Sequence, residues 1–138
     1  MADVFLDTSY AIALAVESDQ HHQRAMDLAN QLLVQAARIL TTRAVLFEIG
    51  NALARQKYRN AAITMLQAIH DDSTVDIVEI DRAIYERGFE LYSSRRDKEW
   101  GLIDCTSFVV MQDKGLTEAL TADEHFRQAG FRALLKES

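Results

Sequence analysis

The feature that most constrains this chain is a short apolar run that ends at a carboxylate near the N-terminus. Val4–Leu6 has the composition of a buried central strand, and Asp7 follows it directly. A helical apolar pattern begins immediately afterwards, with Thr8 or Ser9 as its expected N-cap. In open α/β sheets ligands bind beyond the carboxyl ends of the strands, so Asp7 lies where chemistry is usually done. A plain helix-capping role for Asp7 is the alternative.

The same arrangement recurs late in the chain, where a short expected strand ends at Asp123. His125 follows in a helical turn, and its spacing from Asp123 fits a hydrogen-bonding or packing role better than that of a general base. Asp104 occupies the first turn of an expected helix over residues 102–111. The Val109–Val110 segment is too apolar for a surface helix, so Asp104 is expected to face a cleft near the strand ends.

A further acidic residue, Glu48, lies one turn into an expected helix that begins after Thr41 or Thr42. Its neighbours are apolar, and Gly50 leaves room beside it. A glutamate in such a stretch is costly unless it is paired or bound to a metal. A solvated place in the opening turns of the helix, helped by the helix dipole, is the alternative.

The rest of the chain alternates between short strands and helices. Strands are expected near residues 38–41, 75–78 and 130–135, and helices near 20–38, 60–69 and 81–92. This alternation predicts an α/β fold, a three-layer sandwich with a mostly parallel central sheet. With 138 residues, no proline and only 5 glycines, the chain is expected to form a single domain over residues 1–138. The helical periodicity places several apolar side chains inward. They include Leu33, Ile84, Phe89, Leu91 and Tyr92.

The charge balance bears on the class of partner. The net charge of −6 argues against a nucleic-acid binder, because affinity for phosphate comes mostly from Lys and Arg. A nucleic-acid site that binds cations remains compatible with this net charge, since the bound ions reverse the sign of the local electrostatic field. The single Cys105 cannot form an internal disulfide, which fits a cytoplasmic setting, and it is expected to be a small packed residue. No signal peptide and no membrane-spanning segment are expected.

Two groups of residues permit more than one interpretation. The cations between Arg95 and Lys98, interleaved with Trp100, suit a grip on a nucleic-acid backbone with a stacked base, or equally a solvated turn with an aromatic anchor. His21 and His22 have no partner at a helical ligand spacing, so surface or capping roles are favoured over metal ligation.

Four segments together resemble the PIN-domain nucleases, and within them the VapC-type ribonuclease toxins of bacterial and archaeal toxin–antitoxin pairs. They are Phe5–Ser9, Phe47–Leu53, Asp104–Ser107 and Leu120–Phe126, and the resemblance runs nearly end to end. It implies that four acids form a metal site and act in catalysis, with two hydroxyls in support. The acids are Asp7, Glu48, Asp104 and Asp123, and the hydroxyls are those of Thr8 and Ser107.

The resemblance also implies partners. VapC-type toxins act on RNA, are held by a small antitoxin that places a basic side chain in the acidic site, and are commonly homodimers. The net charge is compatible with a basic partner. Apolar residues on the helices around residues 46–53 and 63–69 suit a dimer interface, or simply the core.

The chemistry explains why such acids would converge. Two carboxylates about 4 Å apart repel by roughly 4 kcal/mol at an effective dielectric constant of 20, so four are tolerable only with bound cations or protons. Mg²⁺ and Mn²⁺ prefer oxygen ligands. A bound ion activates a water and neutralises charge on the leaving oxygen of a phosphodiester. The sequence therefore predicts a Mg²⁺- or Mn²⁺-dependent endoribonuclease in which Asp7, Asp104 and Asp123 hold metal and Glu48 ligates metal or positions the attacking water.

Other functions fit less well. A phospho-receiver domain needs an acceptor Asp on a middle strand and a late Lys after a strand, and neither Lys98 nor Lys114 follows such a run. A haloacid-dehalogenase-type phosphatase needs an Asp two residues after Asp7, where the chain has Ser9. The serious alternative is a PIN fold that binds RNA or a protein partner without cutting.

Overall fold

The computed structural model describes residues 3–137, whose centre is a five-stranded parallel sheet. The strands are β1 (Val4–Leu6), β2 (Ile39–Thr42), β3 (Val75–Val78), β4 (Glu118–Leu120) and β5 (Arg132–Ala133). They lie side by side in the order β3-β2-β1-β4-β5, and each neighbouring pair is parallel. The predicted α/β fold with a parallel central sheet is confirmed.

The central position of β1 explains its composition. Phe5 pairs with Leu40 of β2 on one side and with Ala119 of β4 on the other, and all three residues of β1 are buried. A strand flanked on both edges and covered on both faces meets no water, so every position is apolar. The edge strand β3 is only partly buried and carries Asp76 outward.

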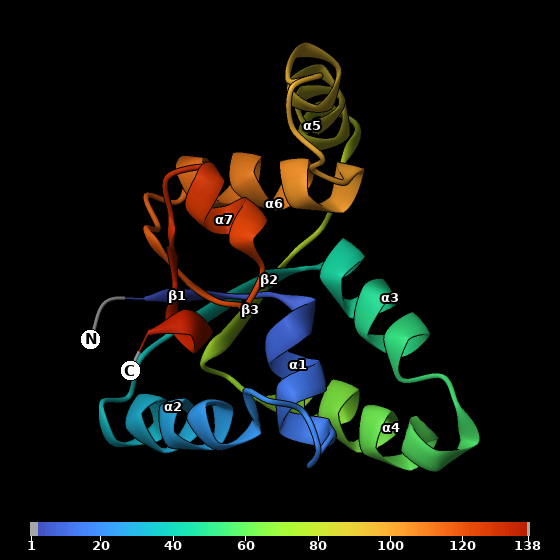
Figure 1. Cartoon of the computed structure of the whole chain (residues 1–138), viewed down its shortest axis with the longest axis vertical. Helices are drawn as coiled ribbons and strands as arrows, with labels where there is room; N and C mark the ends of the chain where they lie inside the picture. Colours follow the sequence, from blue (N-terminus) through green and yellow to red (C-terminus); the bar gives the residue numbers. More distant parts are fainter. Residues whose placement is uncertain (1–2, 138) are drawn as a thin grey trace.

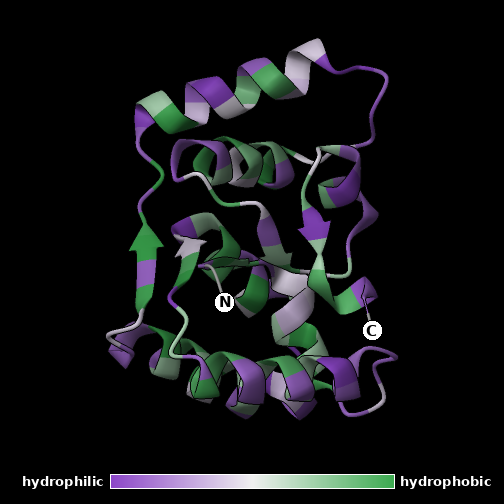
Figure 2. Ribbon diagram, turned by 90° about the vertical axis from the view of Figure 1, so that its left-hand side faces the viewer, coloured by the Kyte–Doolittle hydropathy of each residue, from purple (hydrophilic) through white to green (hydrophobic). Residues whose placement is uncertain are grey.

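Helices cover both faces of the sheet (Figure 1). The helices α1 (Thr8–Ala15), α2 (His22–Val34) and α4 (Gln56–Asp71) lie on one side, and α6 (Leu102–Asp113) and α7 (Glu124–Gln128) lie on the other. Helix α5 (Arg82–Ser94) packs on the outer side of α6, and α3 (Arg43–Ala52) continues from the end of β2. Coloured by hydropathy, the strands are mainly apolar and the outer helices carry the polar residues (Figure 2).

An aromatic chain through the core fixes α6 and α7 against the sheet. Phe108 meets Phe126 edge to face, with ring centroids 5.0 Å apart, and Phe126 lies 6.3 Å from Phe5 of β1. Trp100 meets the other side of Phe108 edge to face at 5.1 Å. Each such pair contributes about 0.5–1.5 kcal/mol beyond the area it buries. This packing therefore fixes the positions of α6, which carries Asp104, and of α7, which begins directly after Asp123, against the sheet.

The structure corrects the expected ends of two helices. The N-cap of α1 is Asp7, not Thr8 or Ser9, and the Asp7 side chain makes no capping hydrogen bond. Helix α2 spans His22–Val34 rather than residues 20–38, and the chain then reverses through Ala36 at a positive φ of 49°. Leu33 is 81% exposed because a step of about 100° turns it away from the buried line through Leu28 and Leu32.

The expected burial of Phe89 and Tyr92 is also wrong, since each is about half exposed. On α5 the reason is the closeness of α6. A Cβ atom added at Gly88 would lie 2.7 Å from Thr106 Oγ1, so the two backbones approach each other along a narrow line. Phe89 and Tyr92 fall beside that line and remain accessible.

The C-terminal segment differs from the expected strand over residues 130–135. Strand β5 has only two residues, and the helical turn η1 (Leu134–Lys136) follows it. The Leu135 amide donates to the Thr121 carbonyl oxygen at 3.1 Å, which draws this turn back across the end of β4. No helix in the described range 3–137 is long and apolar enough to cross a membrane.

Candidate functional site

The ends of β1 and β4 meet the first turns of α6 and α7 at a cleft of about 450 Å³. All four predicted acids line it. Asp7 and Asp123 are the N-cap residues of α1 and α7, Asp104 is in the first turn of α6, and Glu48 comes from the middle of α3. The remaining lining residues are Thr8, Ser9, Ile12, Gly101, Leu102, Ile103 and His125.

Asp7 is the most enclosed of the acids, with 5% of its surface exposed. Its Oδ2 accepts a hydrogen bond of 2.7 Å from the Thr121 hydroxyl. The pKa of Asp7 is raised from 3.8 to about 6, chiefly by burial and to a smaller extent by the nearby charges of Asp104 and Glu48, while the bond from Thr121 opposes the rise. Asp7 is therefore a carboxylate whose negative charge a bound cation would stabilise.

A network of hydroxyls joins the ends of β1 and β4. Besides bonding Asp7, the Thr121 Oγ1 accepts from the Asp123 amide at 3.0 Å and lies 3.0 Å from Ser9 Oγ. Ser9 Oγ in turn accepts from the Ala122 amide at 2.9 Å. The network orients Asp7 and Asp123 relative to each other. Sequence reasoning missed Thr121 as a site residue, although its place at the end of a strand that is equivalent to β1 was a usable signal.

Asp104, Asp123 and His125 form a tight group on the other wall. Their potential ligand atoms all lie within 4.8 Å of one another. His125 Nδ1 is 3.0 Å from Asp104 Oδ2 and 3.3 Å from Asp123 Oδ1, so the expected hydrogen-bonding role of His125 is confirmed. The Gly101 amide also donates to Asp104 Oδ2, at 3.0 Å. Burial raises the pKa of Asp104, and the charge of Asp123 adds to this, while the bonds from Gly101 and His125 oppose it.

Glu48 is half-buried, and its Oε1 accepts a short hydrogen bond from the Thr8 hydroxyl. That bond links α3 to the start of α1 and holds Glu48 toward the cleft. Ser107, the other predicted supporting residue, is 1% exposed, and its hydroxyl has no hydrogen-bond partner within residues 3–137. It is not among the residues that line the cleft.

The donor set of this cleft fits a hard divalent cation. Four carboxylates with flanking hydroxyls offer the oxygen ligands that Mg²⁺ and Mn²⁺ prefer. Within the described part of the chain, no Lys or Arg forms an ion pair with any of the four acids. The negative charge of the cleft is thus not compensated by any Lys or Arg side chain among these residues.

Comparison with known proteins agrees with this architecture. The family model described as PIN domain matches residues 4–132. This chain belongs to the PIN domain family. The 23S rRNA-specific endonuclease VapC20 of two Mycobacterium tuberculosis strains, CDC 1551 / Oshkosh and H37Rv, is 31% identical over 129 residues, which are 93% of this chain and 95% of the relative.

A solved structure shows the same PIN fold. The crystal structure of Mycobacterium tuberculosis VapC20, described as a sarcin–ricin loop cleaving toxin, superposes with a TM-score of 0.81 at 28% identity. The superposition covers 94% of this chain and 96% of that one. The predicted resemblance to PIN-domain, VapC-type ribonuclease toxins is confirmed, and the chain is a homologue of such an endonuclease.

The remaining candidates of this PIN domain do not line the acidic cleft. Trp100 is 6% exposed, and its Nε1 donates to Gln128 Oε1 at 3.0 Å, so it is the aromatic anchor of its loop rather than a platform for a base. Cys105 is fully buried, as expected of a packed residue. The His22 ring bonds the carbonyl oxygen of Ala13 at 2.7 Å, which agrees with a structural role.

Proposed function

We propose that this PIN domain is a Mg²⁺- or Mn²⁺-dependent endoribonuclease and the toxin of a type II toxin–antitoxin system. The observation that carries the proposal is the convergence of Asp7, Glu48, Asp104 and Asp123 on one cleft, without a compensating Lys or Arg among residues 3–137. The homology to a VapC-type endonuclease supports the same reaction class.

The chain's own residues have distinct roles in this mechanism. Asp7, Asp104 and Asp123 hold the cation, and Glu48 ligates it or orients the attacking water. When bound, the cation supplies a water of lowered pKa and neutralises charge on the leaving oxygen. Thr121 fixes the orientation of Asp7 through its bond of 2.7 Å, and Thr8 does the same for Glu48.

His125 has a positioning role in this proposal. The His125 ring bonds Asp104. The His125 backbone amide donates at 2.9 Å to the same Asp123 oxygen that the ring approaches. Such bonds keep ligand carboxylates in one orientation, and their loss typically lowers metal affinity or activity by about 10- to 100-fold. Ser107, predicted as a support from the family resemblance, stays a proposal, and its place behind the cleft makes any support indirect.

The substrate follows from the relatives. VapC20 is named as specific for 23S rRNA and described as cleaving the sarcin–ricin loop. We extend this to the present chain, with a ribosomal RNA loop as its substrate. Sequence-specific recognition of RNA generally targets such loops, because their unstacked bases are accessible.

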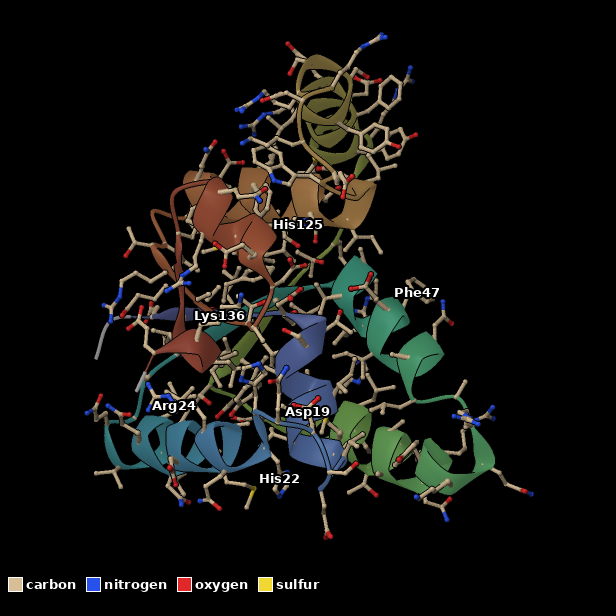
Figure 3. The ribbon with its side chains drawn as sticks, viewed as in Figure 1. Asp19, His22, Arg24, Phe47, His125 and Lys136 are labelled. Carbon is tan, nitrogen blue, oxygen red and sulfur yellow. The ribbon has the colours of Figure 1, made fainter. Side chains whose placement is uncertain are left out.

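Partners and location complete the proposal. A small antitoxin with a basic side chain would match the uncompensated acidic cleft. A homodimer would use helices α3 and α4. Leu46, Ile49 and Leu53 belong to the core rather than to such an interface, while Phe47 is 71% exposed on the outer side of α3 (Figure 3). The protein would act in the cytoplasm as a single domain.

A cleavage assay tests the proposal against a non-catalytic PIN fold. We expect the wild-type protein to cut a hairpin RNA that carries the sarcin–ricin loop in Mg²⁺ or Mn²⁺, and to lose this activity in EDTA. Sequencing of cut RNA ends after brief induction, compared with Asp7→Asn, would show the cellular target. Equal cleavage with and without EDTA would contradict the metal mechanism. If no condition gave RNA cleavage, the result would favour a PIN fold that binds RNA or a protein partner without cutting.

A further inference from the structure

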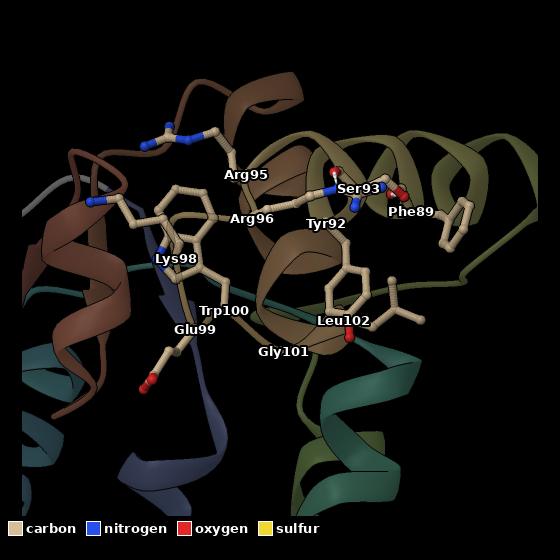
Figure 4. Close-up of a pocket in the computed structure, with 10 residues that line it drawn as sticks. All are labelled: Phe89, Tyr92, Ser93, Arg95, Arg96, Lys98, Glu99, Trp100, Gly101 and Leu102. Carbon is tan, nitrogen blue, oxygen red and sulfur yellow. Dashed lines mark hydrogen bonds between the residues drawn. The ribbon is translucent and has the colours of Figure 1, made fainter.

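A second cleft, of about 690 Å³, opens beside the acidic one. It is formed by the end of α5, the loop that follows, and the start of α6 (Figure 4). Gly101 and Leu102 line both clefts, so one wall is shared. The other lining residues are Phe89, Tyr92, Ser93, Arg95, Arg96, Lys98, Glu99 and Trp100.

The chemistry of this second cleft is opposite to that of the first. Three of its side chains are cations, and Glu99 is its one acid. Arg95 is neutralised by Asp97, whose Oδ1 lies 3.0 Å from its Nε. Among the residues that the structure describes, no carboxylate lies within ion-pairing distance of Arg96 or Lys98. Arg96, whose Nε donates to the Ser93 carbonyl oxygen at 3.2 Å, and Lys98 therefore carry positive charge without an ion-pair partner among these residues, in a cleft that shares a wall with the acidic one.

Half-exposed aromatic rings accompany these charges. Tyr92 and Phe89 are 47% and 50% exposed, and both line the cleft from α5. In Figure 4 they extend to one side of the cleft, while Arg95 and Lys98 extend to the other. Trp100 is not free to stack on a ligand, because it is buried under the Arg95 guanidinium, 5.1 Å from its ring centroid.

We propose that this second cleft is an RNA-binding subsite in which Arg96 and Lys98 contact phosphates and Tyr92 stacks on a base next to the scissile bond. The inference rests on the proposed nuclease function and adds the residues that position the RNA strand. Cationic grooves with aromatic side chains are the usual means of binding single-stranded RNA. With a net charge of −6, the protein repels a polyanion at long range, so a local source of phosphate affinity is needed.

The location of the cleft supports RNA over a basic protein segment. One direction in which an RNA strand can leave the acidic cleft passes the shared wall at Gly101 and Leu102, and this direction leads to the cleft lined by Arg96 and Lys98. A basic antitoxin segment would be repelled by these same two cations. Glu99 disfavours phosphate on its side of the cleft, and its side chain points away from Arg95 in Figure 4.

The experiment measures RNA binding at several salt concentrations in EDTA, where no cleavage occurs. The probes are a fluorescein-labelled hairpin with the sarcin–ricin loop and a labelled oligouridylate. Each phosphate contact on a single strand contributes a slope of about −0.7 to log K against log salt. We expect Arg96→Ala and Lys98→Ala each to reduce the slope by about 0.7, and Lys57→Ala, an equal loss of charge on distant α4, to leave it unchanged.

The aromatic contact is tested separately. We expect Tyr92→Ala to weaken binding about tenfold at constant salt slope, and Tyr92→Phe to restore most of the affinity. Tyr85→Ala is the matched control, since Tyr85 is 48% exposed on the same helix but outside the cleft. In Mg²⁺ the Lys98→Ala variant should show its effect mainly as a higher KM for RNA.

The outcomes separate this inference from the function on which it rests. If the wild type binds both probes and the cleft variants match their controls, the subsite is wrong, whether or not Mg²⁺-dependent cleavage is found. If binding falls in the cleft variants but no condition gives cleavage, the RNA subsite stands and the nuclease proposal fails. Unchanged RNA binding with loss of a co-purified antitoxin would overturn the RNA assignment in favour of protein docking.

Discussion

The two neighbouring clefts differ in how their charges are arranged. In the acidic cleft, Asp7 is almost wholly buried, is bonded by Thr121, and faces other carboxylates without a Lys or Arg partner. In the basic cleft, the cations are more exposed, and one of them, Arg95, is already paired with Asp97. The first arrangement is costly without a bound cation, whereas the second is stable as it stands. The fold thus concentrates unfavourable charge in the cleft where a bound cation can relieve it.

The largest effect is expected from Asp7→Asn. Loss of this proposed metal ligand should reduce Mg²⁺-dependent RNA cleavage by at least about a hundredfold, the upper end of what losing a supporting residue costs. The metal-free fold should be as stable or more stable, because a buried charge is removed. Cleavage rates and urea unfolding in EDTA measure both effects. Asp71→Asn, an exposed change on α4, is the control, and a fully active Asp7→Asn protein would refute the assignment.

The pH dependence of stability follows from the same residue. The pKa of Asp7 is raised from 3.8 to about 6 by folding, so its protonated form stabilises the fold fully below 3.8, and this stabilisation is lost as the pH rises through 6. A shift of roughly two units corresponds to about 3 kcal/mol. In EDTA, the difference in unfolding free energy between Asp7→Asn and the wild type should change in favour of the variant by up to this amount as the pH rises from about 4 to about 7. If the difference in unfolding free energy did not change with pH, folding would not raise the pKa of Asp7.

A smaller effect is expected when the hydroxyl network is broken. Thr121→Val keeps the shape of the side chain but removes the donor to Asp7 and the acceptor for the Asp123 amide. We expect cleavage to fall by about 10- to 100-fold with weaker metal binding, and Thr121→Ser to recover much of both. Thr117→Val, on the exposed segment before β4, is the matched control. Equal activity of the two valine variants would show that the network has no positioning role.

The smallest change is expected in the basic cleft. Asp97→Ala releases Arg95 and removes a negative charge beside the proposed subsite. RNA affinity in EDTA should rise by roughly two- to fivefold, because exposed ion pairs are individually weak. The salt slope should become steeper as Arg95 gains a phosphate contact. A lower affinity would show that the Arg95–Asp97 pair holds the loop in its binding shape.

The sequence predicted the fold and the acids because both depend on short-range patterns. An apolar run followed by Asp7, and a second run that leads to Asp123, place these residues at strand ends, and parallel pairing of β1 with β4 then brings the ends together. The sequence marks Thr121 as a residue at a strand end, but the bonds of the hydroxyl network were not predictable from it. Thr121 has its role only because β4 is the direct neighbour of β1, and the sequence does not state strand order.

Side-chain exposure was harder to predict for similar reasons. Phe89 and Tyr92 fit an inward helical face, but the close approach of Gly88 to Thr106 narrows the contact and leaves them accessible. Trp100 fitted either base stacking or an anchoring role, and its bond to Gln128 decides for the anchor. In each case the deciding partner is distant in sequence.

The most direct test of the central claim is a crystal of the protein soaked in Mn²⁺, with the ion located by its anomalous scattering. We expect an anomalous peak in the acidic cleft, within bonding distance of carboxylate oxygens of Asp7, Asp104 and Asp123, and no peak there in Asp7→Asn. A peak confined to other acids, or none in this cleft under conditions in which the protein cuts RNA, would contradict it.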